Sequence, residues 1–134
     1  MHHGSCLCGA VRYEIEGELG PFVFCHCARC RKANGSAFNA ATGVATDRFR
    51  VVAGRDSLAE FQSSPGVYRV FCGGCGSPLY SRRDYMPETI RLRIGTLDTP
   101  VEGRPAAHIF VSERAEWFEI CDDAPQYPEL PPTR

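Results

Sequence analysis

A chain of 134 residues is long enough for one domain with a modest hydrophobic core, and we expect residues 1–134 to form a single domain. Lysine and arginine total 15 against 16 aspartate and glutamate residues, a near-neutral balance that argues against a protein built chiefly to bind nucleic acid or anionic lipid. No apolar run approaches the ~18 residues needed to span a bilayer, and the first six residues lack the features of a secretory signal, so we expect a cytoplasmic protein.

Short segments of alternating apolar and polar residues lie between glycine and proline turn signals, a pattern typical of an all-β sandwich or barrel. The alternation predicts strands within residues 11–16, 48–51 and 90–94, and further strand candidates lie at 22–25, 37–41, 58–62, 67–72 and 108–112. A short helical turn is expected at residues 28–33. Trp117 is expected in the core, and the proline-rich tail at 125–134 is expected to form an extended surface strap.

Seven of the eight cysteines fall into three short clusters, and in a reducing compartment such clusters hold metal or do chemistry more often than they form disulfides. The clusters are Cys6-Leu7-Cys8, Cys25-His26-Cys27-Ala28-Arg29-Cys30 and Cys72-Gly73-Gly74-Cys75. The eighth cysteine, Cys121, has no partner nearby in the sequence, and we expect it to be a small buried hydrophobic side chain.

The third cluster has the form of a zinc knuckle, because glycines inside and after the cysteine pair let the backbone curl around the sulfur atoms. A closed zinc site needs four ligands, and Cys6 and Cys8 form a second pair whose side chains point the same way. We therefore predict a structural zinc on Cys6, Cys8, Cys72 and Cys75 that contributes to stability directly. The alternatives are buried free thiols, disulfides, or a redox role for the third cluster.

The second cluster then supplies three thiolates, Cys25, Cys27 and Cys30, with one open coordination position, the arrangement of a catalytic zinc. The alternative is a second structural zinc that is closed by Cys121, His26 or a distant group. On an extended segment His26 points away from its two neighbouring cysteines, so we expect it to orient them. Three ligands hold a metal less firmly than four, and we expect the second zinc to be lost more easily on purification.

The joint spacing of the three clusters resembles the glutathione-dependent formaldehyde-activating enzyme family, whose domain is shared with centromere protein V. The segments that carry the resemblance are residues 6–11, 25–31, 71–79 and 108–118. The resemblance implies an Mss4-like fold, an assembly of small coiled antiparallel β-sheets around a structural zinc. It also implies that the structural zinc lies on the first and third clusters and the catalytic zinc on the second cluster, in agreement with the partition from spacing.

The resemblance further implies a zinc-dependent carbon-sulfur lyase that handles an adduct of a thiol and an aldehyde, such as the S-hydroxymethylglutathione formed from glutathione and formaldehyde. Formation of such an adduct needs a proton donor for the developing alkoxide, and the candidates are His26, His108 and Tyr80. Arg31 and Asn34 follow the second cluster and are expected to bind the substrate, with Arg31 pairing to a carboxylate.

Two other functions compete with the lyase. One is a non-catalytic, zinc-stabilised Mss4-like binding module for a protein partner, which has no need of an open coordination position. The other is a chromatin module like the centromere relative, which the near-neutral charge disfavours. The lyase hypothesis predicts a small thiol and a small aldehyde as partners, with neither nucleic acid nor a membrane among them.

Overall fold

The computed structural model describes residues 1–132, and their contacts divide the chain into two compact units. The first unit comprises Met1–Gly20 and Thr42–Glu102, and the second comprises Pro21–Ala41 and the residues from Gly103 onward. Across the described chain, strands far outnumber helices, which confirms the predicted all-β class. No helix among the described residues is long and apolar enough to cross a membrane. That residues 1–134 form a single domain remains a prediction.

Ten strands and one α-helix lie within the described residues. The strands are β1 (His2–Ser5), β2 (Arg12–Ile15), β3 (Phe22–Cys25), β4 (Asn39–Ala45), β5 (Phe49–Ala53), β6 (Leu58–Ser64), β7 (Val67–Cys72), β8 (Pro78–Arg83), β9 (Thr89–Arg93) and β10 (Ala107–Ile109), and the helix is α1 (Ala28–Asn34). The helical turn is present and each predicted strand overlaps an observed one, but the strand predicted at 108–112 ends at Ile109 and gives way to a 3-10 turn at Val111–Glu113. Two strands were not predicted, because β1 lacks an apolar–polar alternation and β8 begins with a proline, a residue that usually marks a turn.

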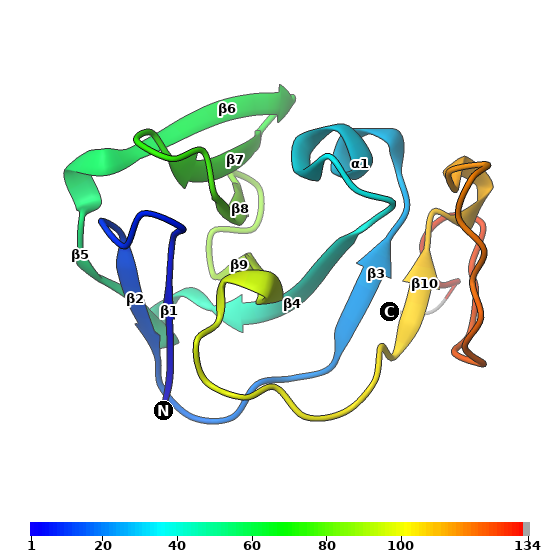
Figure 1. Cartoon of the computed structure of the whole chain (residues 1–134), viewed down its shortest axis with the longest axis horizontal. Coiled ribbons are helices and arrows are strands. Elements are labelled where there is room, and N and C mark those ends of the chain that lie inside the picture. Colours follow the sequence, from blue (N-terminus) through cyan, green and yellow to red (C-terminus); the bar gives the residue numbers. More distant parts are fainter. Residues whose placement is uncertain (133–134) are drawn as a thin grey trace. The chain divides into compact units, whose positions relative to one another are not determined.

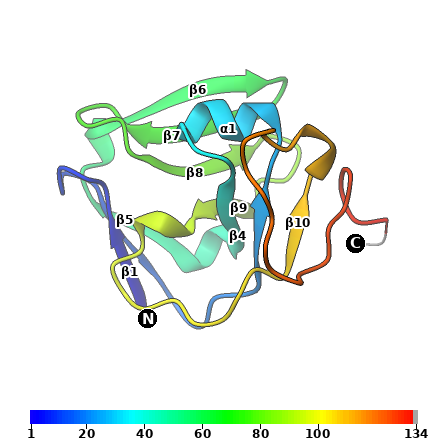
Figure 2. The same cartoon turned by 45° about the vertical axis from the view of Figure 1, so that its right-hand side comes forward.

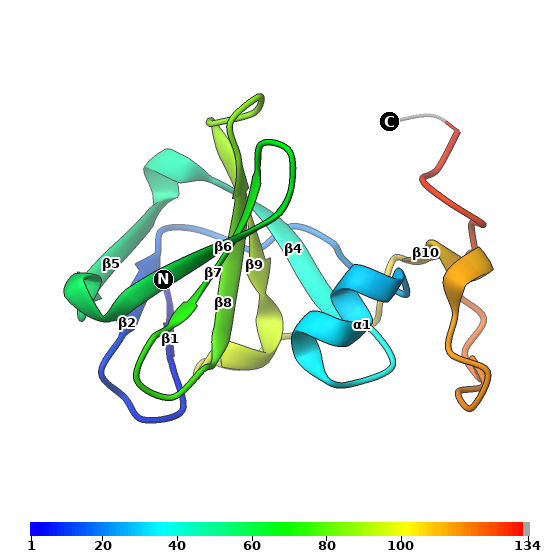
Figure 3. The ribbon, with the colours of Figure 1, turned by 90° about the horizontal axis from the view of Figure 1, so that it is seen from above.

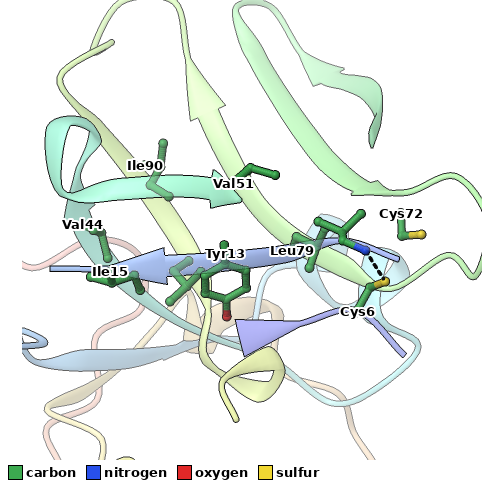
Figure 4. Packing of buried hydrophobic residues seen from close by; sticks show 10 residues of the cluster. Cys6, Tyr13, Ile15, Val44, Val51, Cys72, Leu79 and Ile90 are labelled. Carbon is green, nitrogen blue, oxygen red and sulfur yellow. Dashed lines mark hydrogen bonds between the residues drawn. The ribbon is translucent and has the colours of Figure 1, made fainter. Parts of the chain in front are cut away.

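The first unit contains two groups of antiparallel strands. One is the three-stranded sheet β1-β2-β5, and the other is the meander β9-β8-β7-β6, in which each strand pairs with the next along the chain (Figures 1 and 3). Figure 4 shows the core of this unit, whose members come from both groups. The buried side chains are Cys6, Val11, Tyr13, Ile15, Val44, Val51, Cys72, Leu79, Ile90 and Leu92. Two cluster cysteines therefore lie in the core.

Tyr13 anchors β1 against this core. Its ring is buried, and its hydroxyl lies 2.7 Å from the Thr96 hydroxyl oxygen. The ring covers Gly4 so closely that a Cβ atom on Gly4 would lie 2.1 Å from the ring carbon Cζ. Only glycine leaves room at this position, so the end of β1 and the cysteine turn that follows it depend on Gly4.

The second unit pairs β3 with β10 in parallel, with Cys25 opposite Ile109 (Figures 1 and 2). The proline-rich tail runs beside β10: the His108 amide donates to the Pro125 carbonyl at 2.8 Å, and the Tyr127 amide donates to the His108 carbonyl at 2.9 Å. The tail therefore runs as an extended segment beside β10, as the sequence predicted. Its last two residues, 133–134, lie outside the described part of the chain.

Candidate metal centres

The first and third cysteine clusters meet within the first unit. The Sγ atoms of Cys6, Cys8, Cys72 and Cys75 all lie within 4.8 Å of one another. The Cys8 sulfur is 3.6 Å from that of Cys6 and 3.8 Å from that of Cys72, far longer than the ~2.05 Å of a disulfide. Zn–S bonds of ~2.3 Å in a tetrahedron place sulfur atoms about 3.8 Å apart. The four thiols therefore match the spacing of a four-sulfur zinc site.

Two tight turns bring these sulfurs together. Gly9 and Gly76 have φ values of 80° and 81°, which side chains other than glycine rarely adopt, and each follows the second cysteine of its pair. The Val11 amide donates to the Cys6 sulfur at 3.2 Å (dashed line in Figure 4). The Gly76 amide donates to the Cys72 carbonyl at 2.7 Å and closes the knuckle. These turns hold the two sulfurs of each pair close together.

The pKa values of these thiols indicate how readily the four-sulfur cluster ionises. Hydrogen bonds from the side chain and the backbone of Ser77 lower the pKa of Cys75 to about 5. The Ala10 amide favours the Cys8 thiolate, but contacts with the sulfurs of Cys6 and Cys75 outweigh it and raise the pKa of Cys8 to about 11. Four thiolates packed this closely repel one another, so a divalent cation is required to ionise them all.

The second cluster lies in the second unit, where β3 leads into α1. The Sγ atoms of Cys25, Cys27 and Cys30 lie within 4.8 Å of one another, with Cys25 and Cys30 buried. Cys27 is the N-cap of α1, and its sulfur accepts a hydrogen bond from the Cys30 amide at 3.3 Å. The Glu113 carboxylate accepts from the Ala28 amide at 3.0 Å, so a second amide of the first helical turn is also satisfied.

In the part of the chain that the structure describes, no fourth side chain completes the second cluster. Contacts with Cys27 and Cys30, followed by burial, raise the pKa of Cys25, so metal binding here must displace protons. Within residues 1–132, no histidine nitrogen, carboxylate oxygen or further sulfur joins the three Sγ atoms. Cys121 is exposed, so its expected burial is wrong. Trp117 is 72% exposed and is likewise not in the core. Both belong to residues 110–124, which contain no strand and bury few side chains.

His26, between two of these cysteines, is instead part of a buried hydrogen-bonded chain. It is fully buried, its backbone amide donates to the Ile109 carbonyl at 2.9 Å, and its ring packs near Phe38 at 5.5 Å between centroids. Its Nε2 atom lies 2.8 Å from Nδ1 of His108, which is 1% exposed. The Nε2 atom of His108 lies 3.0 Å from both carboxylate oxygens of Asp122.

The chemistry of the carboxylate determines where the ring protons lie. The Ala124 amide and His108 hold the pKa of Asp122 below its usual range, so Asp122 is ionised and can only accept. His108 therefore carries a proton on Nε2, and when its Nδ1 atom carries none, that atom accepts from Nε2 of His26. Burial, followed by the charge that His108 carries when it is protonated, lowers the pKa of His26 to about 4, so the His26 ring is neutral at pH 7. Its Nδ1 atom, buried and without a partner in the described chain, is then an acceptor.

Sequence reasoning did not find Asp122. His26 and His108 are 82 residues apart and Asp122 follows 14 residues later, so no local spacing links them. The pairing of β3 with β10 brings the two imidazoles together, because it places His108 next to Phe24 in the register.

The three other predicted site residues have different surroundings. An Arg31 guanidinium nitrogen donates to the Glu113 carbonyl at 2.6 Å, so part of its hydrogen-bonding capacity is used within the second unit. The side-chain nitrogen of Asn34 is buried and has no hydrogen-bond partner among the described residues. Tyr80 belongs to the first unit, where its ring packs against Phe49.

Comparison with known proteins identifies similar sequences over most of the chain. The sequence profile of the family named glutathione-dependent formaldehyde-activating enzyme matches residues 1–113. A Halomonas elongata protein provisionally given that name is 30% identical over 125 residues, which cover 87% of this chain and 79% of the relative. An Aspergillus flavus protein with the same provisional name is 26% identical over 85% of this chain, which spans only 54% of that relative.

Two further similarities concern a protein named as a lyase and a solved structure. An uncharacterized lyase of Schizosaccharomyces pombe is 30% identical over 59% of this chain and 56% of its own length. The crystal structure of a Rhodobacter sphaeroides protein superposes with a TM-score of 0.62 and 27% identity, covering 74% of this chain and 90% of that one.

Proposed function

Because the chain belongs to the glutathione-dependent formaldehyde-activating enzyme family, we propose that it is a zinc-dependent carbon-sulfur lyase acting on an adduct of a thiol and a small aldehyde. S-hydroxymethylglutathione is the adduct that the family name suggests. The observation that carries the proposal is the three-sulfur cluster Cys25, Cys27 and Cys30, which no fourth described side chain completes. A cluster that served only to stabilise the fold would gain from a fourth ligand, as the four-sulfur cluster in the first unit does.

We assign a structural zinc to the four-sulfur cluster and a second zinc to the three-sulfur cluster. When bound, the second zinc would favour the thiolate form of a substrate thiol. In the synthetic direction a sulfur–carbon bond forms between thiol and aldehyde, and the thiol proton ends on the former carbonyl oxygen, so the reaction needs no oxidant. The protein's task is to position the two reactants and to move that proton.

The surroundings of each candidate group suggest how the work is divided. Both ring nitrogens of His108 are engaged, so His108 is assigned a positioning role, in which it orients His26. Nδ1 of His26, in the same unit as the three-sulfur cluster, remains as the candidate proton carrier. The unpartnered amide nitrogen of Asn34 would donate to a substrate carbonyl, and Arg31 would pair with a substrate carboxylate. We expect the protein to act in the cytoplasm, where glutathione keeps thiols reduced.

Cysteine variants with measured zinc content test the proposal. Zinc per chain is determined after incubation with zinc, and the exchange of S-hydroxymethylglutathione with glutathione and formaldehyde is followed by NMR. The wild type is expected to hold two zinc ions and to accelerate this exchange. Cys27→Ser should lose one zinc and the acceleration, whereas Cys121→Ser, which removes an exposed thiol outside both clusters, should lose neither.

The same measurements also distinguish the competing function. A protein that holds two zinc ions but leaves the exchange at its spontaneous rate would refute the lyase and favour a zinc-stabilised binding module. Retained acceleration in Cys27→Ser would instead show that the reaction does not depend on the three-sulfur cluster.

A further inference from the structure

A cavity of about 290 Å³ in the first unit combines an apolar floor with a charged rim, and no cluster cysteine lines it. The floor consists of Phe49, Val51 and Ile90; Val51 and Ile90 are also part of the core shown in Figure 4. The rim residues that matter here are Arg55, Tyr80, Arg82, Arg83 and Asp84. The volume is near the lower end of the ~300–1,000 Å³ of small-molecule pockets.

The charges on the rim do not cancel. Arg82 is neutralised, since it forms two hydrogen bonds of 2.7 and 2.8 Å to the Glu60 carboxylate and a third of 3.2 Å to Asp84. Neither Arg55 nor Arg83 forms an ion pair with any residue from 1 to 132. Two guanidinium groups therefore line the cavity without a neutralising carboxylate, which gives it a positive potential.

Two polar groups on the rim also lack partners. One guanidinium arm of Arg83 donates to the Thr89 hydroxyl at 3.3 Å, but its Nε atom is buried and has no acceptor in the described chain. A buried donor without an acceptor is uncommon in native proteins and indicates a missing partner. The Tyr80 hydroxyl makes no hydrogen bond within residues 1–132, and burial raises its pKa, so it stays protonated and can donate.

We propose that this cavity binds a small organic carboxylate. The carboxylate accepts hydrogen bonds from Arg55, Arg83 and the Tyr80 hydroxyl, while the apolar body of the ligand covers Phe49 and Ile90. Guanidinium groups match carboxylates in geometry as well as in charge, and the apolar floor favours an organic acid over a fully hydrated inorganic anion. The proposal is independent of the lyase function, because every residue that lines the cavity belongs to the first unit and none belongs to the three-sulfur cluster or its surroundings.

Phenylacetate is a suitable probe, because it joins a carboxylate to one aromatic ring, and neutral phenylacetamide is its matched control. The zinc-loaded full chain is titrated with each compound, and the methyl resonances of Val51 and Ile90 are followed by NMR. The methyl resonances of Ile109, in the second unit, serve as an internal reference. Phenylacetate is expected to shift the two cavity residues saturably, and phenylacetamide to bind at least about tenfold more weakly, since a charge-assisted hydrogen bond contributes that much.

Three arginine variants complete the test. Arg55→Gln and Arg83→Gln should each weaken phenylacetate binding about tenfold, whereas Arg91→Gln, which removes a charge on β9 outside the cavity, should change it less than twofold. If Arg83→Gln does not fold, the result for Arg55→Gln decides the test, because Arg55 is exposed and its replacement should leave the fold intact. Equal binding of the two compounds would show that the cavity binds only the apolar ring and does not recognise the carboxylate, which would overturn the proposal. The absence of any shift at millimolar phenylacetate would also overturn it.

Discussion

Replacing His108 by phenylalanine would isolate the contribution of the buried imidazole pair. Phenylalanine keeps an aromatic ring against Phe24, whose centroid lies 5.5 Å from that of His108, but it removes the acceptor for His26. The Nε2 proton of His26, fully buried, would then have no partner, which costs about 1–3 kcal/mol. The second unit should therefore open about 30-fold more often, the equivalent of about 2 kcal/mol.

Amide hydrogen exchange measures this opening locally. The amides of His26 and Tyr127, bonded to the carbonyls of Ile109 and His108, should exchange about 30-fold faster in His108→Phe with zinc saturating. The amides between β7 and β8 in the first unit are the internal control and should be unaffected. His108→Asn supplies a carbonyl oxygen near the position of Nδ1 and should restore part of the protection. Unchanged exchange at His26 and Tyr127 in His108→Phe would refute the reasoning.

Three other predictions concern single positions. Gly4→Ala should destabilise the first unit by about 1–3 kcal/mol in urea unfolding, because the added Cβ atom would clash with the Tyr13 ring. Gly95→Ala is the control and should not destabilise the unit, because no atom lies within 4 Å of the Cβ position at Gly95. The pKa of His26 in the folded protein is about 4, below its ordinary value of 6.5, so the unfolded chain takes up this proton at a higher pH than the folded protein does. The free energy of unfolding should therefore fall as the pH is lowered from 6.5 to 4. Thermal unfolding of His26→Phe should not show this decrease. Long-range ¹H–¹⁵N NMR should find both rings, His26 and His108, protonated on Nε2, and a proton on either Nδ1 would contradict the chain of donors.

The elements that sequence reasoning predicted well are those with a strong local signal. β7 occupies the predicted residues 67–72, since this run of β-branched and aromatic residues is bounded by glycines, and α1 begins at the predicted residue 28, directly after its cysteine cap. The failures lie where burial depends on distant contacts. Trp117 and Cys121 are apolar residue types that usually lie inside, yet neither belongs to a strand that would carry it into a core.

The sequence by itself determined which cysteines act together at short range, because one or two residues between ligands leave the backbone few conformations. Tertiary structure decided what surrounds them. The approach of Cys6 and Cys8 to Cys72 and Cys75 requires more than sixty intervening residues to fold, although ligand number made this pairing predictable. No comparable rule of ligand number or spacing predicts the hydrogen-bonded series of His26, His108 and Asp122. It exists because parallel pairing of β3 with β10 closes an 82-residue separation to 2.8 Å.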